Sequence, residues 1–293
     1  MRFIWNLEFE IWKYPNACGK VHIDKETNML RSAVKMVALL LLPLVWLPGC
    51  GASGKVAKAE RSWRSLPLIK DGKADESWAQ IGYGNMVIDD NSLRTDCDAR
   101  GMGLFLYKKE RFGNCQIRVV YRSKDSKSNA GVFIRIDEGI LTRLNEKQAA
   151  AQRNEKGELT PESFKEMQTA SEELTGPWYA VHRGYEVQIC DDADEYHRTG
   201  VIYSLAKAAP VPNTQATDWK TMVITLQGNL VLVEVDGKRL TTFDSDGKDV
   251  RSERKWYEPR FEFKRPASGY IGLQTHDVGD VVFFKEVSVR PLE

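Results

Sequence analysis

The chain has 293 residues, of which 42% are hydrophobic, 28% charged and 10% aromatic. These proportions are typical of globular proteins and exclude a disordered, a collagen-like or a multi-span membrane protein. With 42 Lys and Arg against 41 Asp and Glu, the net charge is +1, so no overall charge attracts the chain to nucleic acid. We therefore expect a neutral partner and no nucleic acid.

The first 50 residues contain one apolar segment, Met36–Leu47, which follows an arginine and a lysine. Its twelve residues are too few to cross a bilayer, which takes about 20, but they match the apolar region of a secretory signal peptide. The next residues, Pro48-Gly-Cys50, complete a sequence that resembles a lipobox, in which the cysteine thiol receives a diacylglycerol. We therefore expect the mature chain to begin at lipidated Cys50.

These features divide the chain into three parts. Residues 1–49 are predicted to be an N-terminal extension and a lipoprotein signal peptide, with translation starting at Met29 or with residues 1–28 as a dispensable extension. Residues 50–62 are small, basic and polar, which is typical of a tether, and residues 63–293 form the folded domain. We expect a protein of the cell envelope, anchored to a membrane by lipid and facing the periplasm or the exterior.

From Trp63 onward, short runs of alternating apolar and polar residues separated by Gly, Asn and Asp turns predict an all-β domain. The clearest strands are 116–122, 131–136, 185–189, 221–226, 230–235 and 281–284. Turn residues at 227–229 and 236–237 indicate hairpins. So many strands in one domain favour a β-sandwich or jelly roll over βαβ units.

One stretch, residues 141–174, is rich in Glu, Lys, Gln and Ala and interrupts this pattern. Thr160 and Pro161 are typical of a helix N-cap and a first helical residue. We expect two short helices inserted between strands. The insert is either a solvated excursion that the fold does not need, or a lid over a site, because it leads directly into Trp178, Tyr179 and His182.

Strand alternation sorts the side chains of three strands into an apolar face and a polar face. The polar side chains are Arg135, Glu186, Gln188, Gln274 and His276. If these strands are neighbours, the five side chains line one surface. The alternative is an ordinary solvated sheet face, on which polar residues are common.

Five motifs occur in a fixed order along the chain: Ser128–Arg135, Gly184–Asp192, Thr199–Tyr203, Gly269–His276 and Val287–Leu292. Together they resemble the 3-keto-disaccharide hydrolase family over about residues 63–293. This resemblance implies a concanavalin A-like jelly-roll β-sandwich, here with a helical insert that is longer than the usual connection. The sequence also departs from the family pattern at Asp218-Trp219-Lys220.

The resemblance implies an enzyme that cleaves 3-keto disaccharides or other 3-keto glycosides. A ketone at C3 acidifies the C2 proton, so the glycosidic bond can break by proton abstraction at C2, loss of the C1 oxygen and addition of water. This chemistry needs a base, a group that holds the enolate oxygen and an acid for the leaving group. Glu186 and His276 are the candidate bases. Arg135 or a divalent metal ion would hold the enolate, and Asp191 or His182 would donate the proton.

A divalent metal ion, if present, would be bound by Glu186, Asp191 and His276. Amide, imidazole and aromatic side chains that could bind the sugar are Asn129, His182, Gln188, Gln274, Tyr203 and Trp219. Two other functions remain open, because a sandwich fold alone does not give a function. One is a non-catalytic carbohydrate-binding module, and the other is an envelope interaction protein whose sandwich only scaffolds the insert.

Overall fold

Two antiparallel β-sheets face each other in the computed structural model, which describes residues 62–247 and 254–292. The eight-stranded sheet has the order β13-β12-β11-β8-β15-β6-β5, and β1 pairs with β15. Its strands are β1 (Arg64–Ser65), β5 (Asn85–Asp89), β6 (Ser92–Asp96), β8 (Cys115–Ser123), β11 (Lys220–Gln227), β12 (Leu230–Val235), β13 (Lys238–Asp244) and β15 (Val282–Pro291).

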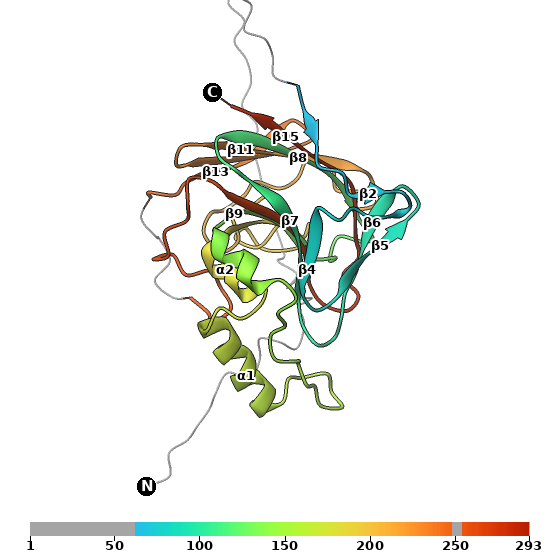
Figure 1. The fold of residues 1–293 in the computed structure, drawn as a ribbon, viewed down its shortest axis with the longest axis vertical. Coiled ribbons are helices and arrows are strands. Elements are labelled where there is room, and N and C mark those ends of the chain that lie inside the picture. The colour runs from blue at the N-terminus through green and yellow to red at the C-terminus, as the bar shows by residue number, and fades with distance from the viewer. Residues whose placement is uncertain (1–61, 248–253, 293) are drawn as a thin grey trace, which may run out of the picture. The chain divides into compact units, whose positions relative to one another are not determined.

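The second sheet has five strands in the order β10-β9-β14-β7-β4. They are β4 (Trp78–Gly82), β7 (Gly103–Phe112), β9 (Ala130–Ile136), β10 (Tyr185–Ile189) and β14 (Gly269–Thr275), and a small hairpin is formed by β2 (Ile69–Lys70) and β3 (Lys73–Ala74). The helices are the 3-10 helix η1 (Glu138–Arg143), α1 (Pro161–Glu172) and α2 (Trp178–Arg183). In Figure 1 the eight-stranded sheet lies above the five-stranded sheet, and α2 and α1 lie below both.

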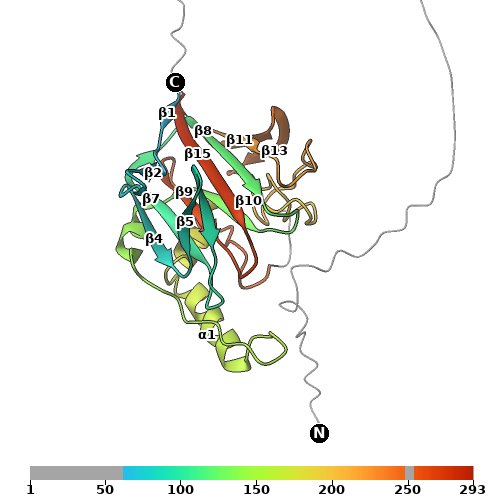
Figure 2. The same cartoon turned by 90° about the vertical axis from the view of Figure 1, so that its right-hand side faces the viewer.

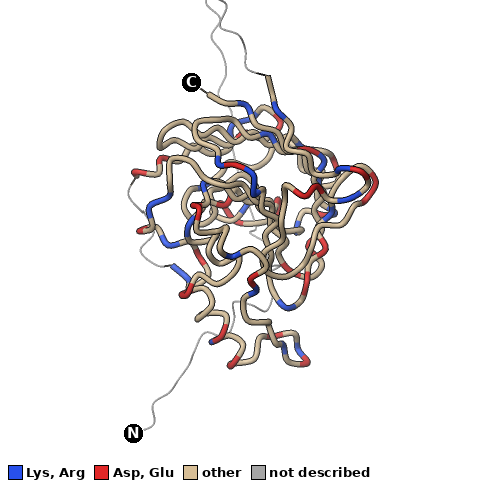
Figure 3. Tube along the Cα trace, in the orientation of Figure 1, with Lys and Arg blue, Asp and Glu red and all other residues tan. Residues whose placement is uncertain are grey.

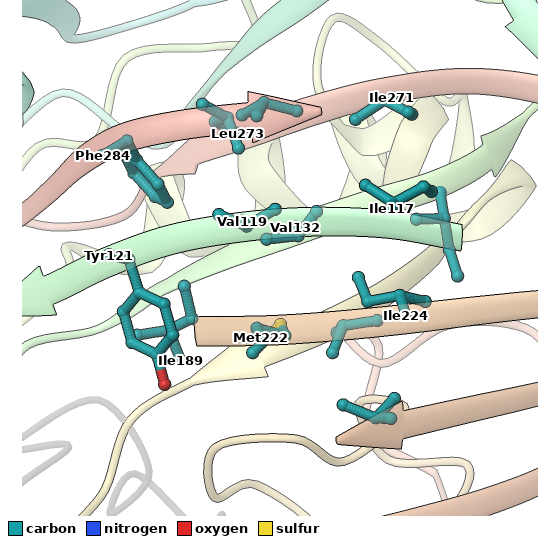
Figure 4. Close-up of a cluster of buried hydrophobic side chains, with 14 of the residues drawn as sticks. Ile117, Val119, Tyr121, Val132, Ile189, Met222, Ile224, Ile271, Leu273 and Phe284 are labelled. Atoms are coloured by element: carbon teal, nitrogen blue, oxygen red, sulfur yellow. The ribbon is translucent and has the colours of Figure 1, made fainter. Parts of the chain in front are cut away.

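The main apolar core lies between the two sheets. Figure 4 shows side chains from both sheets meeting there, including Ile117, Val119, Met222 and Ile224 from the larger sheet and Val132, Ile271 and Leu273 from the smaller. All seven are completely buried. Burial of apolar surface is the dominant favourable term in folding. Because side chains alternate between the two faces along β9, β10 and β14, placing the apolar ones in this core fixes which side chains face outward. The predicted β-sandwich is confirmed.

A second apolar cluster covers the outer face of the five-stranded sheet. There Leu104, Leu106 and Phe133 of the sheet pack with Ile140 of η1 and Met167 of α1. Strands β9, β10 and β14 are therefore buried on both faces. The expectation that the insert is a solvated excursion is wrong, because its helices supply apolar side chains to this cluster.

The insert begins its longer helix as the sequence predicted. Thr160 is the N-cap of α1, and its Oγ1 accepts a hydrogen bond from the N–H of Ser163 at 3.2 Å. Pro161 occupies the first helical position. Figures 1 and 2 show α1 at the end of the described domain opposite the C-terminus.

A β-bulge in β9 moves Arg135 away from the predicted polar face. Arg135 has a φ of +51°, and the register between β9 and β14 shifts beside it, so that one extra residue of β9 is accommodated. Its guanidinium donates a hydrogen bond to the carbonyl oxygen of Gly228, in the turn between β11 and β12 of the opposite sheet. The prediction that Arg135 lines the site is therefore wrong, because simple alternation fails at a bulge.

Acidic and basic residues are interspersed along the described chain (Figure 3), in keeping with the net charge of +1. No helix within residues 62–247 and 254–292 is long and apolar enough to cross a membrane. The predicted signal peptide, the lipidated Cys50 and most of the tether lie outside the described residues.

Candidate active site

A pocket lies on the outer face of the five-stranded sheet, between the strands and the insert that covers them. Its floor comes from β10 and β14 and from residues that adjoin β9 and β14, and its walls come from the insert, from α2 and from the loop segments that contain Gly101, Tyr203 and Tyr257. The lining residues are Gly101, Met102, Asn129, Ala151, Arg153, Met167, Trp178, Val181, Glu186, Gln188, Tyr203, Tyr257, Gln274, His276 and Asp277. The pocket therefore combines apolar walls with several polar groups, as is common in ligand sites.

Glu186 projects from β10 into this pocket and is only 8% exposed. Gly131 on the neighbouring strand makes room for its carboxyl group, since a Cβ at that position would lie 2.2 Å from Glu186 Oε1. With its amide turned so that both of its atoms are satisfied, Gln188 donates to Glu186 Oε1 at 3.2 Å and to the carbonyl oxygen of Ala130 at 2.7 Å. The neighbouring residues thus fit closely around the carboxyl group and fix its position.

Burial raises the pKa of Glu186 to about 8, because desolvation disfavours the charged carboxylate. The charge of His276 and a hydrogen bond from Gln274 oppose this rise without cancelling it. At neutral pH the carboxyl group of Glu186 therefore keeps its proton. A protonated carboxyl in a pocket is suited to donate that proton to a leaving group.

His276 follows β14 and is oriented by Asp280. The distance between His276 Nδ1 and Asp280 Oδ2 is 2.8 Å, and the backbone N–H of Asn129 donates to Asp280 Oδ1 at 3.0 Å. Because Asp280 accepts from Nδ1, the lone pair of neutral His276 is on Nε2. In the part of the chain that the structure describes, Nε2 has no hydrogen-bond partner, and the His276 side chain is 23% exposed.

Burial alone would lower the pKa of His276, but the hydrogen bond to Asp280 and the charges of Asp280 and Asp277 raise it. Its ordinary value is near 6.5, so the shift leaves the imidazole basic enough to accept a proton near neutral pH. The pocket thus contains a protonated acid, Glu186, and a carboxylate-supported imidazole, His276.

Gln274 adds an unsatisfied acceptor to the same pocket. The residue is 4% exposed, and among the described residues its Oε1 is a buried oxygen without a hydrogen-bond partner. A buried acceptor in this state is costly. A hydroxyl group of a bound ligand would satisfy it.

The insert contributes a charged residue to the wall beside His276. Arg153 donates to Asp277 Oδ2 at 3.0 Å, and both residues line the pocket. Among the described lining residues, Arg153 is the one with a permanently positive side chain. The insert is therefore part of the site.

The prediction that Glu186, Gln188, Gln274 and His276 share one surface is confirmed. Two of the predicted sugar-binding residues, Asn129 and Tyr203, line the same pocket. The catalytic and binding roles of all six remain predictions.

Asp191 does not join this site. Its carboxylate pairs with Lys220 Nζ and accepts a hydrogen bond from Thr199 Oγ1 at 2.6 Å. The predicted metal ligands Glu186, Asp191 and His276 are therefore not brought together. Within the described residues, no cluster of three or more His, Cys, Asp or Glu side chains is arranged to hold a metal ion.

The prediction that His182 belongs to the site is also wrong. Its side chain is completely buried beneath α1 and lies 2.8 Å from Ser171 Oγ through Nε2. Burial and, to a lesser extent, the charge of Arg260 lower its pKa to about 3, so the imidazole is neutral. It does not line the pocket and is not available there as a proton donor or a sugar ligand.

Trp219 lies elsewhere, beside β8 and β15 of the eight-stranded sheet. Its ring packs against the guanidinium of Arg122 at 5.0 Å and the ammonium of Lys285 at 5.5 Å. It is not among the lining residues, so the prediction that it stacks on a sugar in this site is wrong.

Sequence reasoning missed Asp280, Arg153 and Tyr257. Asp280 had a local signal, since it follows His276 by four residues across the turn-forming sequence Asp-Val-Gly-Asp. Arg153 and Tyr257 lie in irregular segments, where no periodic pattern assigns a side chain to a face.

Several solved structures are similar to this chain. A candidate glycosyl hydrolase from Parabacteroides distasonis ATCC 8503 has a TM-score of 0.50 and 16% identity, over 76% of this chain and 91% of that one. A second from the same organism has a TM-score of 0.49 and 18% identity, over 79% and 100%. The carbohydrate-binding module CBM66 from Bacillus subtilis has a TM-score of 0.42 and 10% identity, over 73% and 95%.

No curated protein matches the chain. The family model of the 3-keto-alpha-glucoside-1,2-lyase-like domain matches residues 62–290, which confirms the resemblance seen in the sequence motifs. The match covers most of the chain and indicates a glycoside-hydrolase-like or carbohydrate-binding function. The chain belongs to the 3-keto-alpha-glucoside-1,2-lyase-like domain family.

Proposed function

We propose that this pocket cleaves the glycosidic bond of 3-keto disaccharides or other 3-keto glycosides. One observation carries the proposal: an imidazole oriented by Asp280 and a buried, protonated Glu186 face the same pocket. A base and an acid held at separate positions are what elimination from a 3-keto sugar requires. The family match supports the same substrate class.

In the first step, His276 Nε2 removes the proton from C2, and the electron pair of the C–H bond forms an enolate with its charge on the C3 oxygen. The enolate then collapses to restore the C3 carbonyl and to form a C1–C2 double bond. The C1–O bond breaks, and Glu186 gives its proton to the departing oxygen. Addition of water at C1 and return of a proton to C2 complete a net hydrolysis, with both residues back in their starting states.

The enolate oxygen needs a positive or hydrogen-bonding group. Arg135 was the sequence candidate, but it lies in the sandwich interior. Arg153 is the replacement that the geometry favours, because its guanidinium lies at the pocket wall next to Asp277, the residue after His276. The amide groups of Asn129 and Gln274 are also within the lining and offer further hydrogen bonds to the sugar.

The test is to incubate the protein with a panel of 3-keto disaccharides in both anomeric configurations and to measure the released sugars by mass spectrometry. A duplicate panel with a chelator shows whether a divalent metal ion contributes. We expect release with the native protein and strong loss with Glu186→Gln. Binding of the panel without any release would instead favour the non-catalytic carbohydrate-binding module.

We also propose that the enzyme works at the cell envelope, anchored through Cys50 and facing the periplasm or the exterior. The support is the apolar segment and the lipobox-like sequence before Cys50. Mass spectrometry of the native N-terminus tests this, with a diacylated Cys50 as the expected result. A mature chain that retains Met1 or carries an unmodified Cys50 would contradict it.

A further inference from the structure

We infer that His197 is a positioning residue for the pocket, a cation whose hydrogen bonds hold together the two chain segments that carry Tyr203 and Tyr257. Both tyrosines line the pocket, whereas His197 is not among the lining residues. The inference rests on the proposed function, because it takes these two side chains to contact the substrate whose cleavage is proposed. His197 then acts on the substrate without touching it.

The segment that carries Tyr203 runs back alongside β10. The backbone N–H of Tyr203 donates to the carbonyl oxygen of Glu186 at 2.9 Å, and the backbone N–H of Gly200 donates to the carbonyl oxygen of Gln188 at 2.9 Å. His197 lies in the loop that leads into this segment. Its ring packs edge-on against the Tyr203 ring, with ring centres 5.1 Å apart. The imidazole therefore supports one of the side chains that line the pocket.

A chain of hydrogen bonds runs from His197 to the second segment. His197 Nδ1 lies 2.7 Å from Asp194 Oδ2, and His197 Nε2 lies 3.1 Å from Ser204 Oγ. Ser204 Oγ in turn donates to Glu258 Oε1 at 2.8 Å, and this carboxylate oxygen also lies 3.5 Å from His197 Nε2. The chain therefore connects the loop of His197 with the segment around Glu258.

The two residues at the end of this chain directly follow the two tyrosines. Ser204 comes after Tyr203, and Glu258 comes after Tyr257. Both are almost completely buried, and the guanidinium of Arg254 donates to the carbonyl oxygen of Ser204 at 3.1 Å. Ser204 also has a φ of +56°, which is unfavourable for a residue other than glycine and persists only where the surroundings maintain it. Buried contacts beside each tyrosine thus join the two segments.

The polarity of these hydrogen bonds makes His197 a cation. A carboxylate only accepts, so Nδ1 must donate to Asp194. Because the hydroxyl proton of Ser204 is directed to Glu258, Nε2 must donate to Ser204 Oγ. Both ring nitrogens then carry a proton. Burial alone would lower the pKa of His197, but Glu258 and Asp194 raise it, which agrees with this assignment.

The positive charge of His197 also acts on Glu186. Burial raises the pKa of Glu186, and the charges of His276 and His197 both oppose this rise. Removal of the His197 cation should therefore move the pKa of Glu186 further upward. A general loss of stability would not produce this change, so the titration of Glu186 reports specifically on the cation.

The first measurement is steady-state kinetics of the full chain, with the 3-keto disaccharide that the native protein cleaves best. His197→Gln removes the cation, whereas His197→Arg is the matched control that keeps a cation and can donate to both partners. The His197 side chain is 28% exposed, which leaves room for the longer arginine. Ser204→Ala removes only the link to Glu258.

We expect KM to rise about tenfold in His197→Gln and in Ser204→Ala, with kcat nearly unchanged, because less firmly held tyrosines weaken binding of substrate and transition state alike. In His197→Arg, KM should stay near the native value. A variant that merely contains less folded protein would show a lower apparent kcat and an unchanged KM. That result in both His197→Gln and Ser204→Ala would overturn the inference.

The second measurement needs no substrate. Carbon-13 NMR of labelled glutamate side chains follows the titration of Glu186, with Glu186→Gln identifying its signal. The titration should lie at higher pH in His197→Gln than in the native protein, and close to the native position in His197→Arg. An unmoved titration in His197→Gln would overturn the inference. If the native protein cleaves no 3-keto disaccharide, the proposed function fails, and this titration alone decides whether the inference stands.

Discussion

His276 Nδ1 lies 2.8 Å from Asp280 Oδ2, across a turn of four residues that follows β14. The other oxygen of Asp280 accepts a hydrogen bond from the backbone N–H of Asn129, immediately before β9. The carboxylate is therefore fixed between two adjacent strands of the sheet and in turn fixes the imidazole. This arrangement gives His276 a defined tautomer, with Nε2 left for the substrate.

Asp280→Asn tests that arrangement. Without the carboxylate, the tautomer and orientation of His276 are no longer enforced, and we expect kcat to fall by about 100-fold or more. The pKa of His276 should also fall, because Asp280 is the main group that raises it. The acidic limb of the pH profile of kcat/KM should therefore move to lower pH. A loss of activity with an unshifted acidic limb would show that Asp280 acts only on stability.

The pKa of Glu186 predicts how stability depends on pH. In the folded protein the pKa is about 8, against 4.5 for the ordinary group. Between these values the unfolded chain loses the proton and the folded chain keeps it, so the stabilising contribution present below pH 4.5 is lost as the pH rises toward 8. The glutamine side chain of Glu186→Gln cannot ionise, so the stability of this variant should not fall for this reason as the pH rises.

Urea unfolding at pH 5 and pH 8.5 measures the effect. Relative to the native protein, Glu186→Gln should gain on the order of a few kcal/mol in free energy of unfolding between the two pH values. If the free energies of unfolding of the variant and the native protein differ by the same amount at both pH values, Glu186 is already ionised in the folded protein at neutral pH.

Gly131→Ala should inactivate the pocket while the domain remains folded. The added Cβ would lie 2.2 Å from Glu186 Oε1 and must displace the carboxyl group. Gly113→Ala is the matched control, because its Cβ would meet only ordinary contacts at 3.7 Å and beyond. We expect turnover to fall by about 100-fold in Gly131→Ala and to be unchanged in Gly113→Ala. Similar activity in both variants would show that the position of Glu186 is not critical.

Replacing residues 146–174 with a short Gly-Ser linker should destabilise the domain. The replacement removes Leu159, Met167 and Ala170 from the apolar cluster that covers Leu104 and Leu106. Deletion of a single large core side chain typically costs about 2–5 kcal/mol, so we expect a loss of several kcal/mol in urea unfolding and increased binding of a hydrophobic dye. A melting temperature within a few degrees of the native value would restore the view that the insert is dispensable.

The sequence predicted the sandwich well because period-two alternation marks strands that have one face in a core. It also placed Glu186, Gln188, Gln274 and His276 together, since these strands are regular up to the site. The failure at Arg135 has a local cause: one bulge residue reverses the alternation.

The remaining wrong predictions concern which residues a side chain contacts, not where the strands lie. Alternation says which face a side chain takes but not what it meets there. Asp191 is paired with Lys220, which comes from a strand far along the chain, and His182 is covered by α1. Only the tertiary structure reveals such contacts, and the same holds for Tyr257 in the wall of the pocket.

The most direct test of the proposed chemistry is cleavage of a 3-keto disaccharide in D₂O, followed by NMR at C2, with enzyme-free substrate and product as controls for spontaneous exchange. If His276 removes the C2 proton, the first released 3-keto sugar should carry deuterium at C2. Both deuterium incorporation and cleavage should fall by about 10²–10⁴-fold in His276→Ala. Cleavage that leaves the C2 proton in place, or exchange that persists undiminished in His276→Ala, would contradict the account.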